Sequence, residues 1–217
     1  MSPAEGGCTA VVFDFGGVFV DSPFTAVQAA AADLGADPDT LIDIVFGPYD
    51  QDTDHAWHRL ERGELDLEAA RELIRAASVD AGGPELDPVE LLMALGGGGV
   101  RSAMVEFCRS LRTDGIATGL LTNNAAEFAA FWRPLLPLDE LFDDVVDSSE
   151  VGMRKPDERI FRLALERLGA TAERTAFVDD AAGNVAGARR AGLQAVLIGP
   201  HPSDEPAAIA ALRALVG

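Results

Sequence analysis

The sequence predicts an α/β protein built on a doubly wound, mostly parallel sheet. Five short apolar runs each end in polar or glycine residues, which is typical of strands that helices cover on both faces. Helical patterns separate the later runs, and this alternation predicts a parallel sheet between two helical layers. The five runs are AVVFDF at 10–15, IATGLLTN at 116–123, DVVDSS at 144–149, TAFVDD at 175–180 and QAVLIG at 194–199.

The helices expected around the later runs have clear patterns. One ends at Gly115, just before the second run, and one helix follows each of the second, third and fourth runs. Their sequences are VRSAMVEFCRSLRTDG, AAEFAAFWRPL, PDERIFRLALERLGA and NVAGARRAG. Sheets of this kind bind ligands at the carboxyl ends of their strands, around the point where the strand order reverses. Site residues are therefore expected at the ends of the runs.

The interval from 23 to 99 interrupts the alternation, because its patterns are helical only. It contains FTAVQAAAADLGA, HAWHRLERGELDLEAARELIRAA and DPVELLMAL, and it closes with the glycines at 96–99. We predict an all-helical cap domain over 23–99, inserted into a core domain formed by 1–22 and 100–217. The glycines are expected to form a flexible return to the core.

The composition describes an acidic protein with a sizeable core. The chain has 217 residues, 48% of them hydrophobic, and 36 acidic against 17 basic residues give a net charge of −19. This charge repels nucleic acid and anionic membranes, so neither is an expected partner. No stretch has the length of a membrane span, the residues MSPAEGGCTA lack a basic end followed by an apolar segment, and Cys8 and Cys108 do not indicate a disulfide framework. We expect a cytoplasmic protein that acts on a small molecule.

Polar residues at the ends of the runs are the candidates for a site. Asp14 lies between Phe13 and Phe15, where a charge is expensive unless it is paired or bound to a metal. Parallel strands end at one edge of the sheet, so the candidates that follow different strands are expected to converge with Asp14. The other candidates are Thr122 with Asn123, the segment before Lys155, and Asp179 with Asp180.

The motifs at these positions resemble those of the haloacid dehalogenase superfamily of hydrolases. Four motifs occur in the family's order: VVFDFGGVFVDS at 11–22, LLTNN at 120–124, MRKPDERIF at 153–161 and FVDDAAGN at 177–184. The resemblance covers the whole core and, less specifically, the insertion, which is similar to the family's small helical cap. It implies a Rossmann-like core and a hydrolase.

The resemblance also implies a phosphoryl-transfer site. Asp14 would be the nucleophile, because a carboxylate can accept a phosphoryl group as an aspartyl phosphate. The hydroxyl of Thr122 and the backbone N–H of Asn123 would bind phosphoryl oxygens, and Lys155 would stabilise charge that grows in the transition state. Taken singly, Thr122 and Asn123 are equally typical of a turn, and Lys155 of a solvated loop. Four motifs in register favour the site.

The same resemblance implies that the cofactor is Mg²⁺. Clustered carboxylates repel one another unless a cation lies among them, and oxygen ligands suit Mg²⁺. The expected ligands are Asp14, the backbone carbonyl of Gly16 and Asp180. Adjacent strand residues point to opposite faces, so Asp179 and Asp180 should have different roles. Counted back from Ala188 and Gly192, the family's fourth motif aligns Asp180 with the direct ligand, and the resemblance thus implies a supporting or water-mediated position for Asp179, with Asn184 as an orienting residue.

Gly16 is the main departure from the family's pattern. Phosphatases of the superfamily usually carry a second aspartate two residues after the nucleophile, which protonates the leaving group and then activates water. Relatives that resemble sugar-phosphate phosphatases tolerate glycine at this position. These relatives, and proteins similar to the phosphatase half of soluble epoxide hydrolases, also share the tryptophan and the Leu-Glu-x-Gly pattern that this chain has at Trp57 and 60–63. The preferred interpretation is a magnesium-dependent phosphomonoester hydrolase acting on a small phosphorylated metabolite, with a sugar phosphate as one candidate.

Two alternatives stay open because of Gly16. A 2-haloacid dehalogenase also lacks the second acid, since its aspartate attacks carbon without a metal, but dehalogenases do not keep the paired aspartates of the fourth motif. A regulatory protein could retain the site for binding alone. The intact set of Asp14, Thr122, Lys155 and Asp180 argues against such a loss of activity.

The cap residues receive no catalytic role from the sequence. Trp57 and Leu60 are expected in the core of the cap, while His55 and His58 are expected at its surface without a third metal ligand. Arg154, beside the candidate lysine, either assists the site or faces water. The sequence does not reveal the substrate pocket of the cap.

Overall fold

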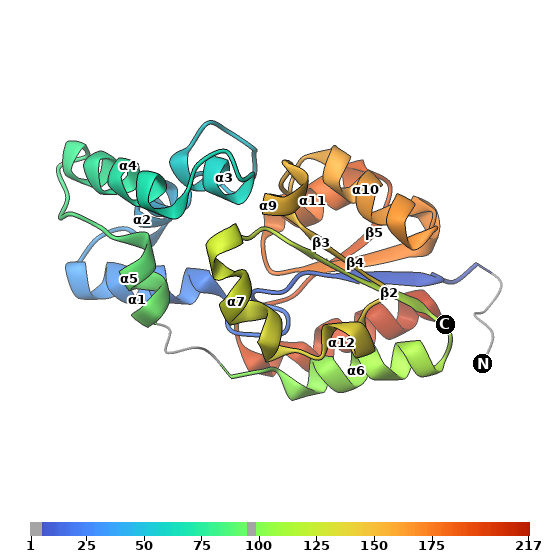
Figure 1. The fold of residues 1–217 in the computed structure, drawn as a ribbon. Coiled ribbons are helices and arrows are strands. Elements are labelled where there is room, and N and C mark those ends of the chain that lie inside the picture. The colour runs from blue at the N-terminus through green and yellow to red at the C-terminus, as the bar shows by residue number, and fades with distance from the viewer. Residues whose placement is uncertain (1–5, 95–98) are drawn as a thin grey trace.

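A computed structural model describes residues 6–94 and 99–217, and its centre is a sheet of five parallel strands (Figure 1). The strand order is β3-β2-β1-β4-β5, so the chain winds outward from β1 in both directions. This order confirms the predicted doubly wound parallel sheet. The strands are β1 (Ala10–Phe13), β2 (Ala117–Thr122), β3 (Asp144–Asp147), β4 (Thr175–Asp179) and β5 (Gln194–Leu197).

The central strand β1 is fully buried and fixes the register of its two neighbours. Val11 and Phe13 pack into the hydrophobic cluster on one face of the sheet, whereas Val12 packs into the cluster on the other face. Phe13 pairs with Leu120 of β2 and with Val178 of β4. Since these strands are parallel, the pairings align their carboxyl ends, and the residues that follow them meet at one edge of the sheet.

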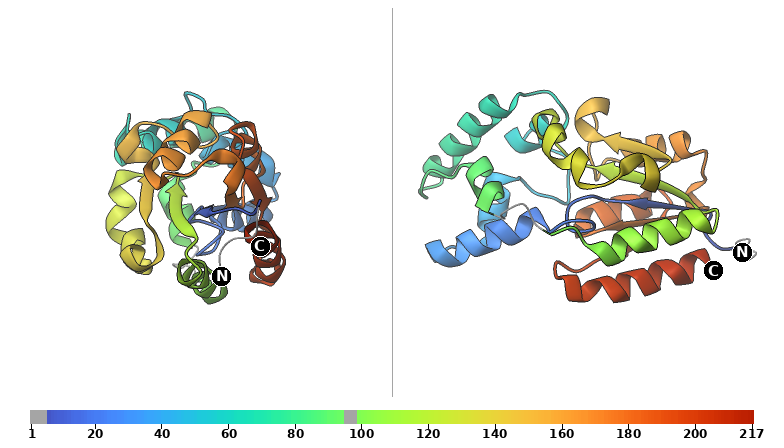
Figure 2. Two further views of the ribbon diagram at one scale, coloured as in Figure 1. Left: turned by 90° about the vertical axis from the view of Figure 1, so that its right-hand side faces the viewer. Right: turned by 60° about the horizontal axis from the view of Figure 1, so that its bottom comes forward.

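Helices cover both faces of the sheet. α6 and α12 lie side by side on one face, and α10 and α11 lie on the other (Figure 2). In the described parts of the chain, no helix is both long and apolar enough to cross a membrane. The helices after the cap are α6 (Ser102–Thr113), α7 (Ala129–Trp132), α8 (Leu138–Leu141), α9 (Ser148–Val151), α10 (Glu158–Leu168), α11 (Ala182–Arg190) and α12 (Glu205–Val216).

α12 has no counterpart among the predicted helices, although Ile209, Leu212 and Val216 recur at helical spacing along its alanine-rich sequence. In the structure Ala208 and Leu212 are buried in the same hydrophobic cluster as Phe13 and complete the layer beside α6. Short 3₁₀ helices complete the core: η1 (Ala126–Phe128), η2 (Arg133–Leu135), η3 (Ala172–Arg174) and η4 (Pro202–Asp204).

The chain leaves the sheet after β1 and forms helices α1 to α5, the cap helices, before it returns at α6. They enclose a hydrophobic cluster of their own, which also includes Ala125 and Phe128 of the core. The division into a core of 1–22 and 100–217 and a cap of 23–99 stays a prediction, and residues 96–98 of the glycine return lie outside the described residues. The cap helices are α1 (Pro23–Leu34), α2 (Pro38–Val45), α3 (Ala56–Glu61), α4 (Leu67–Asp80) and α5 (Pro88–Ala94).

One cap residue lies elsewhere than the sequence predicts. His58 is expected at the surface, but its side chain is fully buried, and the backbone N–H of Thr53 donates to its Nδ1 at 3.0 Å. The prediction is wrong because α3 turns this face toward the loop before it. Burial, followed by the nearby positive charge of Arg154, lowers the pKa of His58 to about 3.

We expect His58 to make the stability of the protein depend on pH. The imidazole stays neutral in the folded protein down to about pH 3, whereas the unfolded chain protonates it near its ordinary pKa of about 6.5. Its contribution to stability is therefore complete above about pH 6.5 and is lost as the pH falls toward 3, at up to about 1.4 kcal/mol per pH unit.

Urea denaturation across this pH range checks the effect. His58→Gln should show a shallower decline of the free energy of unfolding than the wild type. His201→Gln, at an exposed position, is the control and should keep the wild-type slope. Equal slopes in the wild type and His58→Gln would contradict the prediction.

Candidate active site

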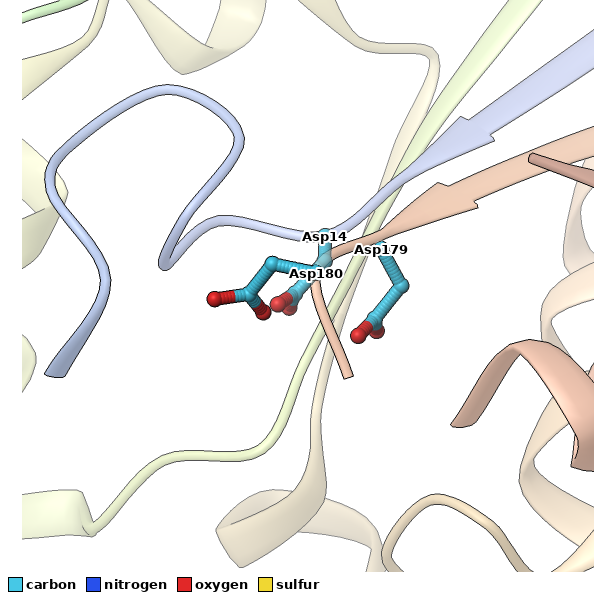
Figure 3. Close-up of side chains that lie close together, drawn as sticks. All are labelled: Asp14, Asp179 and Asp180. Atoms are coloured by element: carbon cyan, nitrogen blue, oxygen red, sulfur yellow. The ribbon is translucent and has the colours of Figure 1, made fainter. Parts of the chain in front are cut away.

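Three carboxylates gather at the carboxyl ends of the two central strands. Asp14 follows β1, Asp179 ends β4, and Asp180 comes directly after it (Figure 3). Each offers an oxygen within 4.8 Å of oxygens from the other two. Asp14 and Asp180 line a cavity of about 300 Å³ that extends from the strand ends to the cap helices. The alignment of the parallel strands thus brings together residues 165 positions apart or more in the sequence.

Lys155 lies between two of these carboxylates. Its Nζ is 2.6 Å from Oδ1 of Asp14 and 2.7 Å from Oδ2 of Asp179, and its side chain is buried. Burial alone would lower the pKa of Lys155, but the two carboxylates outweigh burial and raise it. Burial raises the pKa of Asp14; Lys155 opposes this, while Asp179 and Asp180 add to it. The ammonium is therefore the group that favours an ionised Asp14 at this buried position.

Asn123 fixes the backbone of the lysine. The N–H of Lys155 donates to Oδ1 of Asn123 at 2.8 Å, and Nδ2 of Asn123 donates to the carbonyl of Lys155 at 3.0 Å. Thr122, the last residue of β2, is buried and lines the cavity beside Asn123. With the Asn123 side chain engaged in this way, its backbone N–H is the group left for the predicted contact with phosphate.

The two adjacent aspartates have different surroundings. Asp179 accepts hydrogen bonds from Lys155, from the backbone N–H of Ala181 at 2.8 Å and from Nδ2 of Asn184 at 3.1 Å. Asp180 instead lies against the loop after β1, where a Cβ on Gly17 would come within 2.1 Å of its Oδ2. Gly17 also has a φ of +71°, so glycine satisfies both the backbone and the space that Asp180 needs.

The oxygen cluster fits a divalent cation. If all three carboxylates were ionised around the one ammonium, the cluster would carry a net charge of −2. Burial and the negative charge of Asp179 raise the pKa of Asp180 to about 7, because this excess charge is unfavourable in a dry site. A divalent cation would neutralise the excess, and carboxylate oxygens are ligands that Mg²⁺ prefers. The carboxylate of Asp179 already accepts hydrogen bonds from Lys155 and Asn184. This is consistent with its absence from the predicted ligand set of Asp14, the Gly16 carbonyl and Asp180.

Arg154 connects the core to the cap helices. Its guanidinium is fully buried, and Nε donates to Oε2 of Glu61 at 2.7 Å. The other oxygen of Glu61 accepts from Nε1 of Trp57 at 2.9 Å and from the hydroxyl of Tyr49 at 3.1 Å. The structure therefore answers the open question on Arg154, which lies inside the protein and holds the cap against the loop that carries Lys155.

The cavity is lined mainly by apolar rings on its cap side. Tyr49 and Trp57 line the cavity. Four other polar residues of the same cap segment are not among the described residues that line it: Asp52, His55, His58 and Arg59. The sequence analysis missed most of this lining and the Glu61 partner of Arg154. The pattern at 60–63 contains Glu61, but no spacing shows which residue it pairs with. The aromatic lining includes Phe24, Phe46, Tyr49, Trp57, Phe128 and Trp132.

The fold and the site together define a hydrolase of the α/β class with an inserted helical cap. The family described as haloacid dehalogenase-like hydrolase matches residues 8–192, and the chain belongs to this family. It is an enzyme of the family that the four motifs indicate, so the resemblance drawn from the sequence is confirmed.

Comparisons with known proteins place phosphatases among the relatives. Sesquiterpene phosphatase astK of Aspergillus oryzae is 29% identical over 209 residues, which are 96% of this chain and 96% of that protein. Bifunctional epoxide hydrolase 2 of Sus scrofa is 28% identical over 201 residues, 87% of this chain but only 36% of that protein. The structure of a HAD-like family hydrolase from Porphyromonas gingivalis superposes with a TM-score of 0.68 and 27% identity, covering 95% of this chain and 98% of that one.

We expect the Arg154–Glu61 pair to be important for stability. Replacing Arg154 by Met leaves a buried carboxylate without its cation, which should lower the free energy of unfolding by about 3–5 kcal/mol. The double variant Arg154→Met with Glu61→Gln should be less destabilised than the sum of the single changes, because both charges are then gone.

Chemical denaturation measures both effects. Arg109→Met removes the exposed ion pair with Glu140 and is the matched control, with an expected loss of about 0–1 kcal/mol. A loss no larger for Arg154→Met than for this control would show that the buried pair contributes nothing to the closed arrangement of cap and core.

Proposed function

We propose that this protein is a magnesium-dependent phosphatase that hydrolyses a phosphate monoester through a covalent aspartyl phosphate. The observation that carries the proposal is the carboxylate of Asp14, exposed to a cavity at one end and paired with the buried ammonium of Lys155 at 2.6 Å. A carboxylate beside a fixed positive charge, which favours its ionised form against the effect of burial, is suited to attack a phosphoryl group and to tolerate the charge that develops on it.

The residues of the chain have distinct roles in the proposed reaction. An oxygen of Asp14 attacks phosphorus, the bond from phosphorus to the ester oxygen breaks, and the alcohol leaves with a proton taken from water. A second water then attacks phosphorus, the bond to Asp14 breaks, and inorganic phosphate departs. Thr122, the backbone N–H of Asn123 and Lys155 hold the phosphoryl oxygens throughout.

Binding an anion in so acidic a protein requires local positive charge. Lys155 is the only basic side chain among the described residues that line the cavity, against a net charge of −19 for the chain. Asp14, the Gly16 carbonyl and Asp180 would hold Mg²⁺, and the bound ion supplies charge neutralisation and polarisation of the phosphoryl group. A cytoplasmic location, with neither nucleic acid nor membrane as partner, stays the prediction from composition.

A turnover assay tests the proposal. We expect release of inorganic phosphate from para-nitrophenyl phosphate in the presence of Mg²⁺, loss of this release on chelation, and no turnover in Asp14→Asn. Asp180→Asn should retain its fold, as checked by circular dichroism, and should need more Mg²⁺ for the same rate. Turnover that survives in Asp14→Asn would exclude the covalent mechanism.

Two other results would favour the alternatives. Halide release from a 2-haloacid without metal would indicate carbon attack by Asp14 and thus a dehalogenase. Calorimetric binding of Mg²⁺ and inorganic phosphate without any turnover would indicate a regulatory protein. The paired aspartates at 179 and 180, both at the carboxylate cluster, favour the phosphatase over a dehalogenase, and the intact set of Asp14, Thr122, Lys155 and Asp180 favours it over a regulatory protein.

We expect Gly16 to limit the rate for poor leaving groups. It has no side chain to protonate the departing alcohol, yet an added Cβ would meet only the Cδ of Pro23, at 3.4 Å. The backbone therefore has room for the Cβ of Gly16→Asp, which should speed hydrolysis of alkyl phosphates, toward the roughly 10²–10⁴-fold that general acid–base help is typically worth.

The leaving-group dependence separates this effect from a change in binding. Gly16→Asp should gain little on para-nitrophenyl phosphate, whose leaving group needs no proton, and Gly16→Ala should gain nothing on any ester. A rate on alkyl phosphates that is unchanged in Gly16→Asp would show that another group already serves as the acid.

A further inference from the structure

We propose that the cavity selects phosphate monoesters whose alcohol part is apolar and rich in carbon, in preference to sugar phosphates. The proposal rests on the phosphatase function above and names its substrate class. The cavity of about 300 Å³ has most of its polar groups near the strand ends, and the rest of its wall is mainly apolar, with Glu61 as the acidic residue that the cap contributes. This volume is at the lower end of the range for small-molecule sites, ~300–1,000 Å³.

The rings of the wall come from both cap and core. Phe24 of α1 lies 4.7 Å from Tyr49 between ring centroids, and Phe46 lies 4.9 Å from Trp57. Trp57 faces Phe128 of the core at 6.4 Å. These contacts form a nearly continuous aromatic surface from the cap to the core, and each of the five side chains also borders the cavity.

The polar atoms that Tyr49, Trp57 and Glu61 bring to this wall are already used by the protein. The hydroxyl of Tyr49 and Nε1 of Trp57 both donate to the same oxygen of Glu61, and Arg154 donates to the other oxygen. Burial, and then the adjacent Glu61, raise the pKa of Tyr49 well above its ordinary value, so the phenol stays a donor to Glu61. A sugar hydroxyl in this space would lose its hydrogen bonds to water and gain few from the wall, which is unfavourable.

Part of the apolar wall is incompletely covered. Phe24, Tyr49 and Leu92 border the cavity and are only partly buried, although they lie between cap and core. An apolar alcohol group would bury their remaining surface, and each buried methylene is worth about fourfold in affinity. Asp21 and Asn124 are the further polar residues of the lining, and the amide oxygen of Asn124 already accepts from the N–H of Ala125.

Tryptophan fluorescence offers a direct test that does not depend on turnover. The chain contains two tryptophans, Trp57 and Trp132, and both line the cavity. Asp14→Asn, titrated in Mg²⁺ with n-butyl, n-hexyl and n-octyl phosphate, should show an emission change whose dissociation constant falls about fourfold per methylene until the cavity is filled. Glucose 6-phosphate should bind at least tenfold more weakly than n-hexyl phosphate. Equal affinities, or no dependence on chain length, would overturn the proposal.

Turnover by the wild type gives the second test. n-Hexyl phosphate and glucose 6-phosphate are both esters of primary alcohols, so their leaving groups are similar. A higher kcat/KM for n-hexyl phosphate would therefore reflect how the cavity binds the rest of the alcohol. Leu92→Gln places a polar group in the wall and should reduce this preference about tenfold, mainly through KM. Met93→Gln, one residue further on α5 and 76% exposed, is the control and should keep it.

The two proposals fail in different ways. Turnover of para-nitrophenyl phosphate that requires Asp14, together with equal kcat/KM for n-hexyl and glucose 6-phosphate, would overturn the substrate class and leave the phosphatase intact. Tight binding of n-octyl phosphate in the fluorescence titration without turnover of any ester would overturn the phosphatase and support the apolar cavity.

Discussion

The buried ammonium of Lys155 is the interaction on which the rest of the site depends. Removing a charge from water costs several kcal/mol unless partners compensate it, and here Asp14 and Asp179 flank Nζ at 2.6 and 2.7 Å. The three groups come from β1, β4 and the loop after α9, so these ion pairs form only when the two strands pair in register and the loop closes over their ends. Asn123, which bonds both backbone groups of the lysine, adds β2 to the same assembly.

Arg154 and Lys155 show how adjacent residues can serve two parts of a protein. The lysine points to the carboxylates of the core, whereas the arginine reaches Glu61 on α3 of the cap. Because Glu61 also accepts from Tyr49 and Trp57, one buried carboxylate closes the cap over the site and occupies the polar atoms of its rings. The hydrogen bonds that hold the cap therefore also occupy polar atoms of its inner wall, which links closure of the cap to the proposed substrate class.

Two neighbouring glycines in the loop after β1 are there for different reasons. Gly17 has a positive φ, and the space where its Cβ would lie is filled by the carboxylate of Asp180. A side chain at this position would displace a predicted metal ligand. Gly16 has no such conflict, since an added Cβ meets only Pro23 at an ordinary distance. The space around the Cβ position therefore does not require glycine at residue 16, in contrast to residue 17.

The sequence alone determined the fold class and much of the candidate site. Short runs that are apolar on both faces predict buried parallel strands, and the aligned ends of these strands bring Asp14, Thr122 and Asp180 together. Lys155 reaches them from the loop after α9. The tertiary structure decided the contacts that residue spacing along the chain cannot predict. The pairing of Arg154 with Glu61, the burial of His58 and the aromatic wall each depend on how the cap helices pack against the core. Side chains 93 residues apart, as in the Arg154–Glu61 pair, become partners only through that packing, and no local pattern in the chain records it.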